Sequence, residues 1–245
     1  MKKNYEYLFY DTLSSTNTYC KEQFTNLDDL TVVQALNQTN GRGRSGHTWD
    51  ASGDSVSVSL LIKNSVGIIF DEKFLNAITL ITSCAVNKVL RKTGFDILIK
   101  WPNDQVYLDK KLCGILVEAI TCDNLVQGVI VGIGINLNQD NFDTPYPATS
   151  LKILTHETKD PKIYAHLIMT ELLNEIEKYV SGDNSYIEYN NIYSSLKNRY
   201  VSYYKNNQKY FGYVKGLNEF GELLIDDEII KFGEVMLVRK EEDHG

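Results

Sequence analysis

The segment from Gln38 to Ala51, QTNGRGRSGHTWDA, combines residue types that bind anions and flat rings. Arg42 and Arg44 stand between glycines, and Trp49 follows a few residues later. The planar guanidinium of arginine matches carboxylate and phosphate groups, and an indole ring stacks on flat rings. The segment therefore predicts either a mobile flap over a charged, ring-bearing ligand or an ordinary exposed basic loop, and composition alone leaves both open.

Residues Gly41 to Gly46 also match the sequence motif G-x-G-x-x-G of a dinucleotide-binding loop. That loop needs a strand before it and a helix directly after it, because the helix N-terminus holds the pyrophosphate. Here the chain continues through HTWDASGDSVSVSLLIK into a predicted strand. Because a strand and not a helix follows, the motif does not indicate a dinucleotide site.

A second segment, IKWPNDQVYLDKKLCGILVE, runs from Ile99 to Glu118. It places Asn103 and Asp104 in a tight turn between two strands, Lys111 at the entry of the next strand and Gly114 inside that strand. A glycine within a strand often marks the close approach of a ligand or of another backbone. Asparagine and aspartate after a proline are equally typical of a plain hairpin turn. The segment alone leaves both interpretations open.

Periodicity and turn residues predict the elements that position these segments. Helices are expected at residues 14–24, 71–94, 161–180 and 186–196. Strands are expected at residues 5–11, 30–36, 55–63, 96–101, 105–108, 111–120 and 125–137. The turns between the last four strands are short, so these strands should be antiparallel neighbours. From about residue 199 the chain changes to very short strands, which indicates a small all-β unit.

The composition is that of a globular protein with a negative net charge. Of the 245 residues, 43% are hydrophobic and 23% are charged, which suffices for one sizeable core and a small second unit. The net charge of −7 argues against a protein that covers nucleic-acid phosphates with a basic face. No apolar run reaches the roughly 18 residues of a membrane span. Acidic residues interrupt the N-terminal segment before it could form the apolar core of a signal peptide. We therefore expect a cytoplasmic protein that does not enter a membrane.

The remaining conspicuous side chains have structural interpretations. The cysteines form no C-x-x-C pair and stand inside apolar runs, so we expect buried thiols at Cys20, Cys84, Cys113 and Cys122. Trp101 is expected in the core at the end of a strand. Three histidines do not have the spacing of metal ligands, so we expect them to be structural or exposed: His156, His166 and His244. Arg239 is a candidate to reach back toward a bound nucleotide.

Four motifs together resemble one family. The segments SSTN, GRGRSGHTW, KWPNDQVYLDKKLCGILVE and GIGINLN occur in this order over nearly the whole chain and are similar to those of the biotin protein ligases. These enzymes attach biotin to a lysine of carboxylase carrier domains. Four separated motifs in order are a far stronger signal than any one of them alone.

The resemblance implies an ATP-dependent reaction through biotinyl-AMP, with biotin and ATP as substrates, Mg²⁺ as cofactor and a biotin carboxyl carrier domain as partner. It implies biotin-binding roles for Ser15, Thr16, Asn17, Gln38, Gly41, Arg42, Gly43, Arg44, Lys111, Gly114, Leu116 and Gly132. It implies ATP-binding roles for Arg42, Arg44, His47, Trp49, Asn103, Lys111 and Asn136. Arg44, Lys111 and Asp104 are the implied catalytic residues, and Asp104 is also the implied magnesium ligand.

These residue types suit the chemistry. A biotin carboxylate and the α-phosphate of ATP repel each other, so cations are needed where charge develops. Arg42, Arg44 and Lys111 supply them. The mixed anhydride must be sheltered from water, and a glycine-rich flap permits closure. In the second step the acceptor lysine must lose a proton, for which Asp104 is the candidate base or orienting anion.

The chain also departs from the family pattern. His47 stands where many relatives have a third arginine of the loop, and Ser45 where another basic or bulky residue is common. A neutral imidazole donates a hydrogen bond but does not hold a phosphate with two donors. We therefore expect weaker retention of the adenylate.

The resemblance implies an α+β fold of the class II synthetase-like biotin/lipoate ligase type. A mixed, mostly antiparallel sheet backed by helices is expected in a catalytic domain of residues 1–196, followed by a small SH3-like β-barrel in residues 197–245. By analogy, a homodimer through the sheet edge near residues 125–138 is a further expectation. Relatives that act as repressors carry a DNA-binding domain ahead of SSTN, and 13 residues precede Ser14, so we expect a monofunctional ligase without specific DNA binding.

Two alternatives stay open. A lipoate or octanoate ligase shares the fold and the acyl-adenylate chemistry, but the polar SSTN segment and Gln38 suit a ureido ring better than a fatty chain. A catalytically idle biotin-binding module would explain His47, but it would not need Arg44, Asp104 and Lys111 together.

Overall fold

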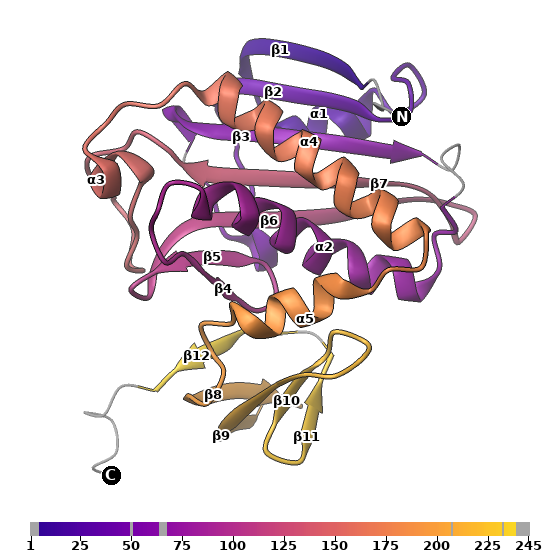
Figure 1. The fold of residues 1–245 in the computed structure, drawn as a ribbon. Helices are drawn as coiled ribbons and strands as arrows, with labels where there is room; N and C mark the ends of the chain where they lie inside the picture. The colour runs from indigo at the N-terminus through magenta and orange to yellow at the C-terminus, as the bar shows by residue number, and fades with distance from the viewer. Residues whose placement is uncertain (1–4, 50, 64–67, 207, 232, 239–245) are drawn as a thin grey trace.

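A seven-stranded mixed sheet forms the larger part of the protein. The computed structural model describes residues 5–49, 51–63, 68–206, 208–231 and 233–238. The strands of this sheet are β1 (Glu6–Leu13), β2 (Thr31–Gln38), β3 (Ala51–Lys63), β4 (Leu98–Lys100), β5 (Asp104–Tyr107), β6 (Lys110–Cys122) and β7 (Leu125–Asn136). Their spatial order is β1-β2-β3-β7-β6-β5-β4, as Figure 1 shows. The pair β1–β2 is parallel and the other pairs are antiparallel.

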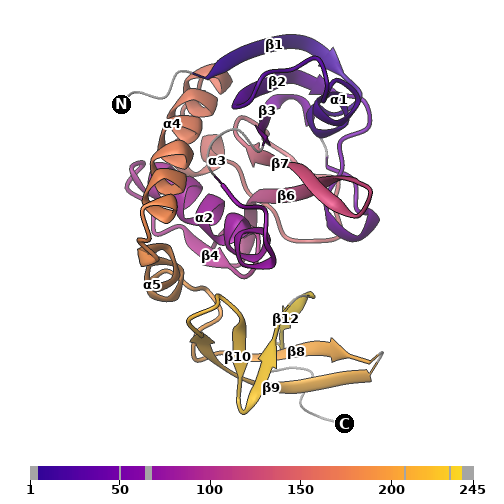
Figure 2. The same cartoon turned by 90° about the vertical axis from the view of Figure 1, so that its right-hand side faces the viewer.

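The sheet has helices on both faces. The two long helices α2 (Glu72–Arg91) and α4 (Pro161–Val180) cover one face, and the short α1 (Thr16–Glu22) lies on the opposite face, as the end-on view in Figure 2 shows. Local sequence explains where these helices begin. The side chains of Ser15 and Asp71 accept hydrogen bonds from backbone N–H groups of the first turns of α1 and α2.

Strand β3 shows why the two faces differ. Its sequence alternates valine and serine, and alternate side chains of a strand point to opposite faces. Val56, Val58 and Leu60 join the main core beneath α2 and α4. Ser57 and Ser59 are buried on the α1 face, where apolar packing is limited to a small cluster around Cys20. One face of the sheet is therefore stabilised by apolar burial, and the other carries polar groups.

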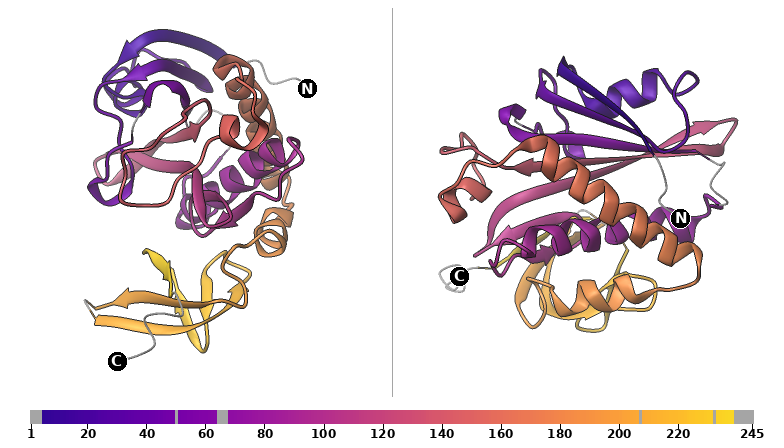
Figure 3. Two further views of the ribbon diagram at one scale, coloured as in Figure 1. Left: turned by 90° about the vertical axis from the view of Figure 1, so that its left-hand side faces the viewer. Right: turned by 45° about the horizontal axis from the view of Figure 1, so that its top comes forward.

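A second, smaller sheet follows in the chain. Helix α5 (Ser185–Ile192) leads to β8 (Tyr200–Lys205), β9 (Gln208–Leu217), β10 (Leu223–Ile225), β11 (Glu228–Ile230) and β12 (Val235–Leu237). All pairs are antiparallel in the order β11-β10-β9-β8-β12, and Figure 3 shows α5 between the two sheets. The predicted fold class, a mixed and mostly antiparallel sheet backed by helices with a small β unit after it, is confirmed.

Specific contacts join the two sheets. Trp101 is 5% exposed, in the core as predicted, and its indole Nε1 donates a hydrogen bond to the carbonyl of Gly221, 3.2 Å away. Arg199, ahead of β8, forms an ion pair with Asp109 of the β5–β6 turn at 2.7 Å. The small sheet is therefore attached near the turn that carries the predicted site residues.

Several expectations were wrong. The last helix ends at Ile192 rather than residue 196, and α3 (Leu151–Thr155) was not predicted. Cys122 is exposed at the β6–β7 turn, whereas the other three cysteines are buried as expected. β7 is no sheet edge, because it is hydrogen-bonded to β3 on one side and β6 on the other. In the part of the chain that the structure describes, no helix has the length and apolar character needed to span a membrane.

Candidate functional site

The predicted site residues gather on the α1 face of the sheet. Along β7, Val131 and Ile133 face the main core, so Gly132, Gly134 and Asn136 lie on the other side. In β6, Ile115 belongs to the main core, so its alternate neighbours Gly114 and Leu116 also lie on the α1 face. The sheet order places these strands side by side, with β3 next to β7. Segments far apart in the sequence therefore meet on one surface.

A polar group of four side chains, three of them buried and Gln38 half-buried, lies where α1 meets β2 and β3, and we call it the head cluster. It consists of Thr16, Asn17, Gln38 and Ser59. The backbone N–H of Thr16 donates to Oε1 of Gln38 at 2.8 Å. The hydroxyl of Ser59 lies 2.7 Å from Oγ1 of Thr16 and 2.6 Å from Oδ1 of Asn17. Ser15 precedes the cluster as the N-cap of α1.

Gly132 makes room for this cluster. A Cβ atom at that position would lie 2.2 Å from Oδ1 of Asn17, closer than real Cβ contacts allow. The absence of a side chain therefore lets the amide of Asn17 rest on the backbone of β7. The close approach expected from the sequence was at Gly114, where the side chains of Lys111 and Trp49 lie against the strand.

The segment of residues 41–49, which we call the flap, folds back on itself. The backbone N–H of Gly43 donates to the carbonyl of His47 at 2.7 Å, and that of Trp49 donates to the carbonyl of Gly41 at 2.9 Å. Between these bonds lies the 3-10 turn η1 (Arg44–Gly46), in which Gly46 has φ +80°. The flap is therefore a short hairpin, and Gly46 supplies its left-handed conformation.

Two arginines of the flap reach the sheet. One guanidinium nitrogen of Arg42 donates to both carboxylate oxygens of Glu118, at 3.1 and 2.9 Å. The guanidinium of Arg44 donates to Oδ1 of Asn103 at 2.9 Å, and Nδ2 of Asn103 donates to the carbonyl of Ile115. Both arginines thus cross from the flap to β6 or to the turn before β5.

Trp49 packs against two glycines of the sheet. A Cβ atom on Gly134 would lie 2.3 Å from Cε2 of the indole, and one on Gly114 would lie 3.4 Å from Cζ3. The indole Nε1 is buried and has no hydrogen-bond partner among the described residues. A buried indole N–H usually has a partner, so this N–H is an unsatisfied donor among the described residues.

Lys111 occupies the centre of the site. Its ammonium group lies 2.8 Å from Oδ1 of Asp104 and 5.9 Å from the centre of the Trp49 ring. Its backbone is fixed on both sides, since its N–H donates to Pro147 and its carbonyl accepts from Thr149. Nδ2 of Asn136 also donates to the Lys111 carbonyl, at 3.2 Å. This lysine is therefore well positioned although its side chain is partly open to solvent.

His47 contacts the small sheet instead of the site centre. Its Nε2 atom lies 3.8 Å from a carboxylate oxygen of Glu234, and its ring lies edge-on to Tyr146. The side chains of His47 and Glu234 are about half exposed. The contact is weak, as expected for an exposed pair.

The structure thus brings the predicted residues together in two neighbouring groups. One is the head cluster with Gly132, and the other is Arg44, Trp49, Asn103, Asp104 and Lys111. Leu116 contacts the first group, because its carbonyl accepts from Nδ2 of Asn17 at 3.3 Å. Arg239 and His244 lie outside the described residues.

Sequence reasoning gave no role to two residues of this surface, Ser59 and Glu118. Ser59 could have been found from the valine–serine alternation, which places a serine on a buried strand face. Glu118 has an equivalent signal, since it is two residues beyond Leu116 on the same face of β6. Cys113, on the opposite face, has no nucleophilic role, because burial and the charge of Asp104 raise the pKa of its thiol.

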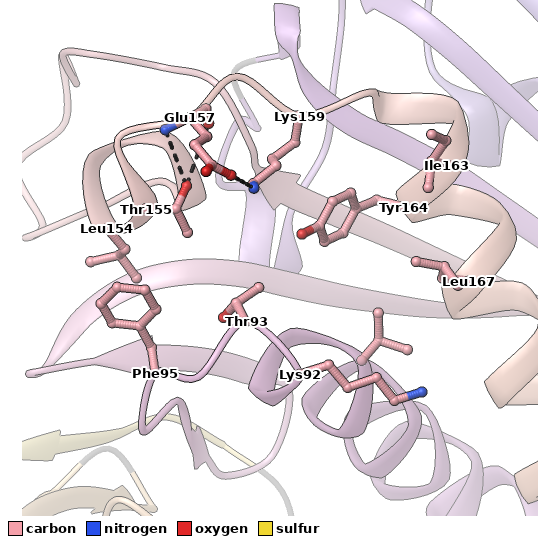
Figure 4. Close-up of a pocket in the computed structure, with 11 residues that line it drawn as sticks. Lys92, Thr93, Phe95, Leu154, Thr155, Glu157, Lys159, Ile163, Tyr164 and Leu167 are labelled. Atoms are coloured by element: carbon pink, nitrogen blue, oxygen red, sulfur yellow. Dashed lines mark hydrogen bonds and ion pairs between the residues drawn. The ribbon is translucent and has the colours of Figure 1, made fainter.

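A cavity of about 570 Å³ lies elsewhere. Figure 4 shows it beneath α3 and the start of α4, lined by Phe95, Leu154, Tyr164 and the ion pair of Glu157 with Lys159. None of the predicted site residues lines it. Its volume therefore says nothing about the chemistry of the flap and the head cluster.

Known proteins match both the sequence and the fold. The sequence pattern of the biotin/lipoate A/B protein ligase family matches residues 9–136. The bifunctional ligase/repressor BirA of Bacillus subtilis (strain 168) is 35% identical over 140 residues, which are 56% of this chain and 42% of that protein. BirA of Escherichia coli (strain K12) is 27% identical over 225 residues, which are 89% of this chain and 69% of that protein.

Among solved structures, the biotin protein ligase from Aquifex aeolicus in complex with biotin and ATP has a TM-score of 0.82. It is 26% identical, and the match covers 96% of this chain and 99% of that chain. The chain spans about half the length of the curated Bacillus relatives that it matches, 42% and 52%.

Proposed function

We propose, from the premise that the chain belongs to the biotin/lipoate A/B protein ligase family, that it is an ATP-dependent, AMP-forming biotin ligase. In this proposal it converts biotin to biotinyl-5′-AMP and transfers the biotinyl group to a lysine of a biotin carboxyl carrier domain. One observation carries the proposal. Lys111 lies 5.9 Å from the centre of the Trp49 ring on the same sheet face as the head cluster, and a second cation, Arg44, reaches from the flap to Asn103, directly before Asp104, the partner of Lys111. The relatives named as ligases and the Aquifex complex with biotin and ATP support it.

The first step joins two anions. A carboxylate oxygen of biotin forms a bond to the α-phosphorus of ATP, the bond to the bridging oxygen breaks, and pyrophosphate leaves. Lys111 and Arg44 offset the negative charge that develops on the phosphorus oxygens. The flap lies over this position and shields the mixed anhydride from water. Trp49 offers its indole ring for the adenine, while Asn103, Asn136 and His47 are the further nucleotide contacts we propose.

The head cluster is the site that we propose for the ureido ring. Thr16 and Asn17 supply hydroxyl and amide groups in a buried position, the half-buried Gln38 adds a second amide, and Ser15 fixes the start of α1. Gly41, Arg42 and Gly43 close it from the flap side. Buried polar groups reject a ligand that leaves them unpaired, so this cluster disfavours a fatty chain. Gly114, Leu116 and Gly132 form the floor for the rest of biotin.

The second step is acyl transfer. The acceptor amine attacks the carbonyl carbon, the bond to the phosphate oxygen breaks, AMP leaves and one proton is lost from the nitrogen. A free lysine has a pKa of about 10.4, so the proton must be accepted or stabilised at the site. Asp104 is the carboxylate at the site centre, and it becomes available when Lys111 turns from it to the ligand's oxygens.

The donor set of the site fits a magnesium ion that arrives with the nucleotide. Among the described residues no cluster of three or more His, Cys, Asp or Glu side chains is found. Mg²⁺ commonly keeps several waters and uses one or two carboxylates together with substrate phosphates, so Asp104 alone suffices as its protein ligand. Bound there, the ion would neutralise phosphate charge.

Further parts of the proposal concern organisation. We place the catalytic domain at residues 1–196 and the small β domain at residues 197–245, a division supported by the passage from α5 at Ile192 to β8 at Tyr200. We also propose a cytoplasmic protein, a homodimer, and no specific DNA binding, the last supported by the net charge of −7. Light scattering and a mobility-shift assay with biotin-operon DNA test the last two.

The decisive experiment incubates the purified protein with ATP, Mg²⁺, biotin and a carrier domain, and measures the mass of the acceptor. We expect one biotinyl group on one lysine, and no change without ATP. Biotin-dependent pyrophosphate exchange tests the first step alone. Exchange with lipoate but not biotin would favour the lipoate ligase, and no exchange with either would favour a binding module.

A further inference from the structure

Glu118 contacts both groups that enclose the head of the proposed ligand. Its carboxylate accepts from Arg42 of the flap at 2.9 Å and from Nδ2 of Asn17 in the head cluster at 2.8 Å. The flap connects β2 to β3, and Asn17 belongs to α1. One side chain of β6 therefore bridges two segments that are separate in the fold.

The bridge fixes the orientation of Asn17. An ionised carboxylate only accepts hydrogen bonds, so the atom of Asn17 that faces Glu118 must be the amide nitrogen. Both hydrogens of that nitrogen are then used, one toward Glu118 and one toward the carbonyl of Leu116 at 3.3 Å. Oδ1 faces Ser59, and one lone pair of this oxygen stays available. A glutamine at position 118 would remove this constraint, because its own amide group donates as well as accepts.

The bridge also holds Arg42. The side chain of Arg42 is 39% exposed and that of Glu118 is 22% exposed, so the pair is partly shielded from solvent. Fully exposed ion pairs contribute little to stability. Here the carboxylate also accepts a hydrogen bond from a buried amide, so this charge-assisted pair restricts the Arg42 side chain more strongly. With Arg42 held, the flap hairpin has a fixed attachment to the sheet at its N-terminal end, and Arg44 bound to Asn103 provides a second.

We propose that Glu118 is a positioning residue that attaches the flap to the head cluster in the ligand-free protein, so that Arg42 and Asn17 are already oriented when the ligand binds. Glu118 acts through these two residues and does not take part in the chemistry. The effect on biotin rests on the proposed function, whereas the attachment of the flap does not.

The test uses Glu118→Gln, which keeps the size of the side chain and removes its charge. Hydrogen–deuterium exchange of the ligand-free protein reports on the amides of Gly43 and Trp49, which are bonded within the flap. We expect these amides to exchange about fivefold faster in the variant, since a partly exposed ion pair is weak. Steady-state kinetics should show a rise in the KM for biotin of about tenfold, with kcat and the KM for ATP changed less than about threefold.

Two further variants separate this role from a general loss of structure. Glu228→Gln removes the same charge from an ion pair with Lys205 on the small sheet, and we expect native flap exchange and native KM values. Arg42→Gln breaks the bridge from its other end, at an exposed position, and should accelerate flap exchange as much as Glu118→Gln does. In the double variant the two effects should not add, because both remove one interaction. Glu118→Asp, which keeps the charge, should restore part of the protection.

The outcomes are distinct. Flap exchange at the native rate in Glu118→Gln, or additive effects in the double variant, overturns the proposal. A native protein without biotin-dependent activity defeats the proposed function, yet faster flap exchange in the variant would still support the bridge. If Glu118→Gln fails to fold, Arg42→Gln alone decides, and native flap exchange in that variant overturns the proposal.

Discussion

The ammonium group of Lys111 lies 2.8 Å from Oδ1 of Asp104, so the central cation of the site is paired with a carboxylate. The lysine side chain is 37% exposed and the aspartate side chain 19%, which leaves room for a ligand to approach the lysine. A phosphate or carboxylate that enters competes with Asp104 for this cation. A ligand anion that binds the Lys111 ammonium group therefore also releases the Asp104 carboxylate from its ion pair.

The first prediction concerns this lysine. Lys111→Met should lower biotin-dependent pyrophosphate exchange by at least about 100-fold, since a cation that stabilises developing charge is lost. Lys111→Arg should restore little, because the guanidinium is larger and planar and its backbone position is fixed. Lys152→Met is the control, because Lys152 pairs with the exposed Asp140 away from the site. Exchange within about threefold of native in Lys111→Met would contradict the role.

The second prediction separates the two steps at Asp104. Asp104→Asn keeps the shape but accepts no proton, so transfer from preformed biotinyl-AMP to the carrier domain should slow by about 100-fold. Single-turnover transfer measures this step. Asp96→Asn, in an ion pair with Arg91 at the far end of α2, is the control. The assignment fails if Asp104→Ala leaves both adenylate formation and transfer intact.

The third prediction tests the packing of Trp49 on β7. In Gly134→Ala the new Cβ would lie 2.3 Å from Cε2 of the indole, so the ring must move. We expect the KM for ATP to rise about tenfold, consistent with an overpacking cost of about 1–3 kcal/mol, with a smaller effect on the KM for biotin. The same substitution in a Trp49→Ala background should change nothing further. An additional loss there would show that the glycine serves another purpose.

Strong local signals made much of the fold predictable from sequence. The helix expected at residues 161–180 is α4 (Pro161–Val180), because a proline at its first position and an Asp160 cap mark its start. α5 was predicted too long because the backbone of Tyr193 bonds to Ile99 of β4, a tertiary contact that ends the helix. α3 has five residues, too few for a periodic pattern, and only its cap Ser150 marks it.

The candidate site was predictable in part, and for a different reason. The motif residues were named from their resemblance to a family, whereas their proximity depends on the sheet order β2-β3-β7-β6-β5. The spacing of residues along the chain does not reveal that strand order. For the same reason the contacts of Glu118 with Arg42 and Asn17, which lie 76 and 101 positions away, were not visible in the sequence.

The fourth prediction concerns the histidine of the flap. His47→Arg places a permanent cation in the flap next to Glu234, and a guanidinium binds a phosphate with two donors where an imidazole does not, so biotinyl-AMP should dissociate more slowly, by about threefold. Stopped-flow displacement of the adenylate measures the rate. His47→Gln, which donates a hydrogen bond without a charge, should remain close to native. Equal dissociation rates for the arginine variant and the native protein would reject the role of position 47.

The fifth prediction concerns stability and pH at the buried Glu175 of α4. Burial raises the pKa of this carboxyl group, but hydrogen bonds from Lys178 and Lys88, 2.6 and 2.8 Å away, together with their charges, outweigh burial and lower it overall. A carboxylate with a lowered pKa in the folded state stabilises the protein above its unfolded pKa of about 4.3. This stabilisation is lost as the pH falls through the lower, folded value.

Glu175→Gln should therefore reduce the free energy of unfolding by about 1–3 kcal/mol at pH 7, the usual cost of losing a hydrogen bond to a charged group. The difference from the native protein should shrink as the pH falls below about 4.3, because the native carboxylate is then protonated too. Urea unfolding at a series of pH values measures it. Glu228→Gln, in an exposed pair, should cost less than about 1 kcal/mol throughout. A difference that stays constant from pH 7 to the acid limit would show that the cost of Glu175→Gln arises from packing and not from the charge.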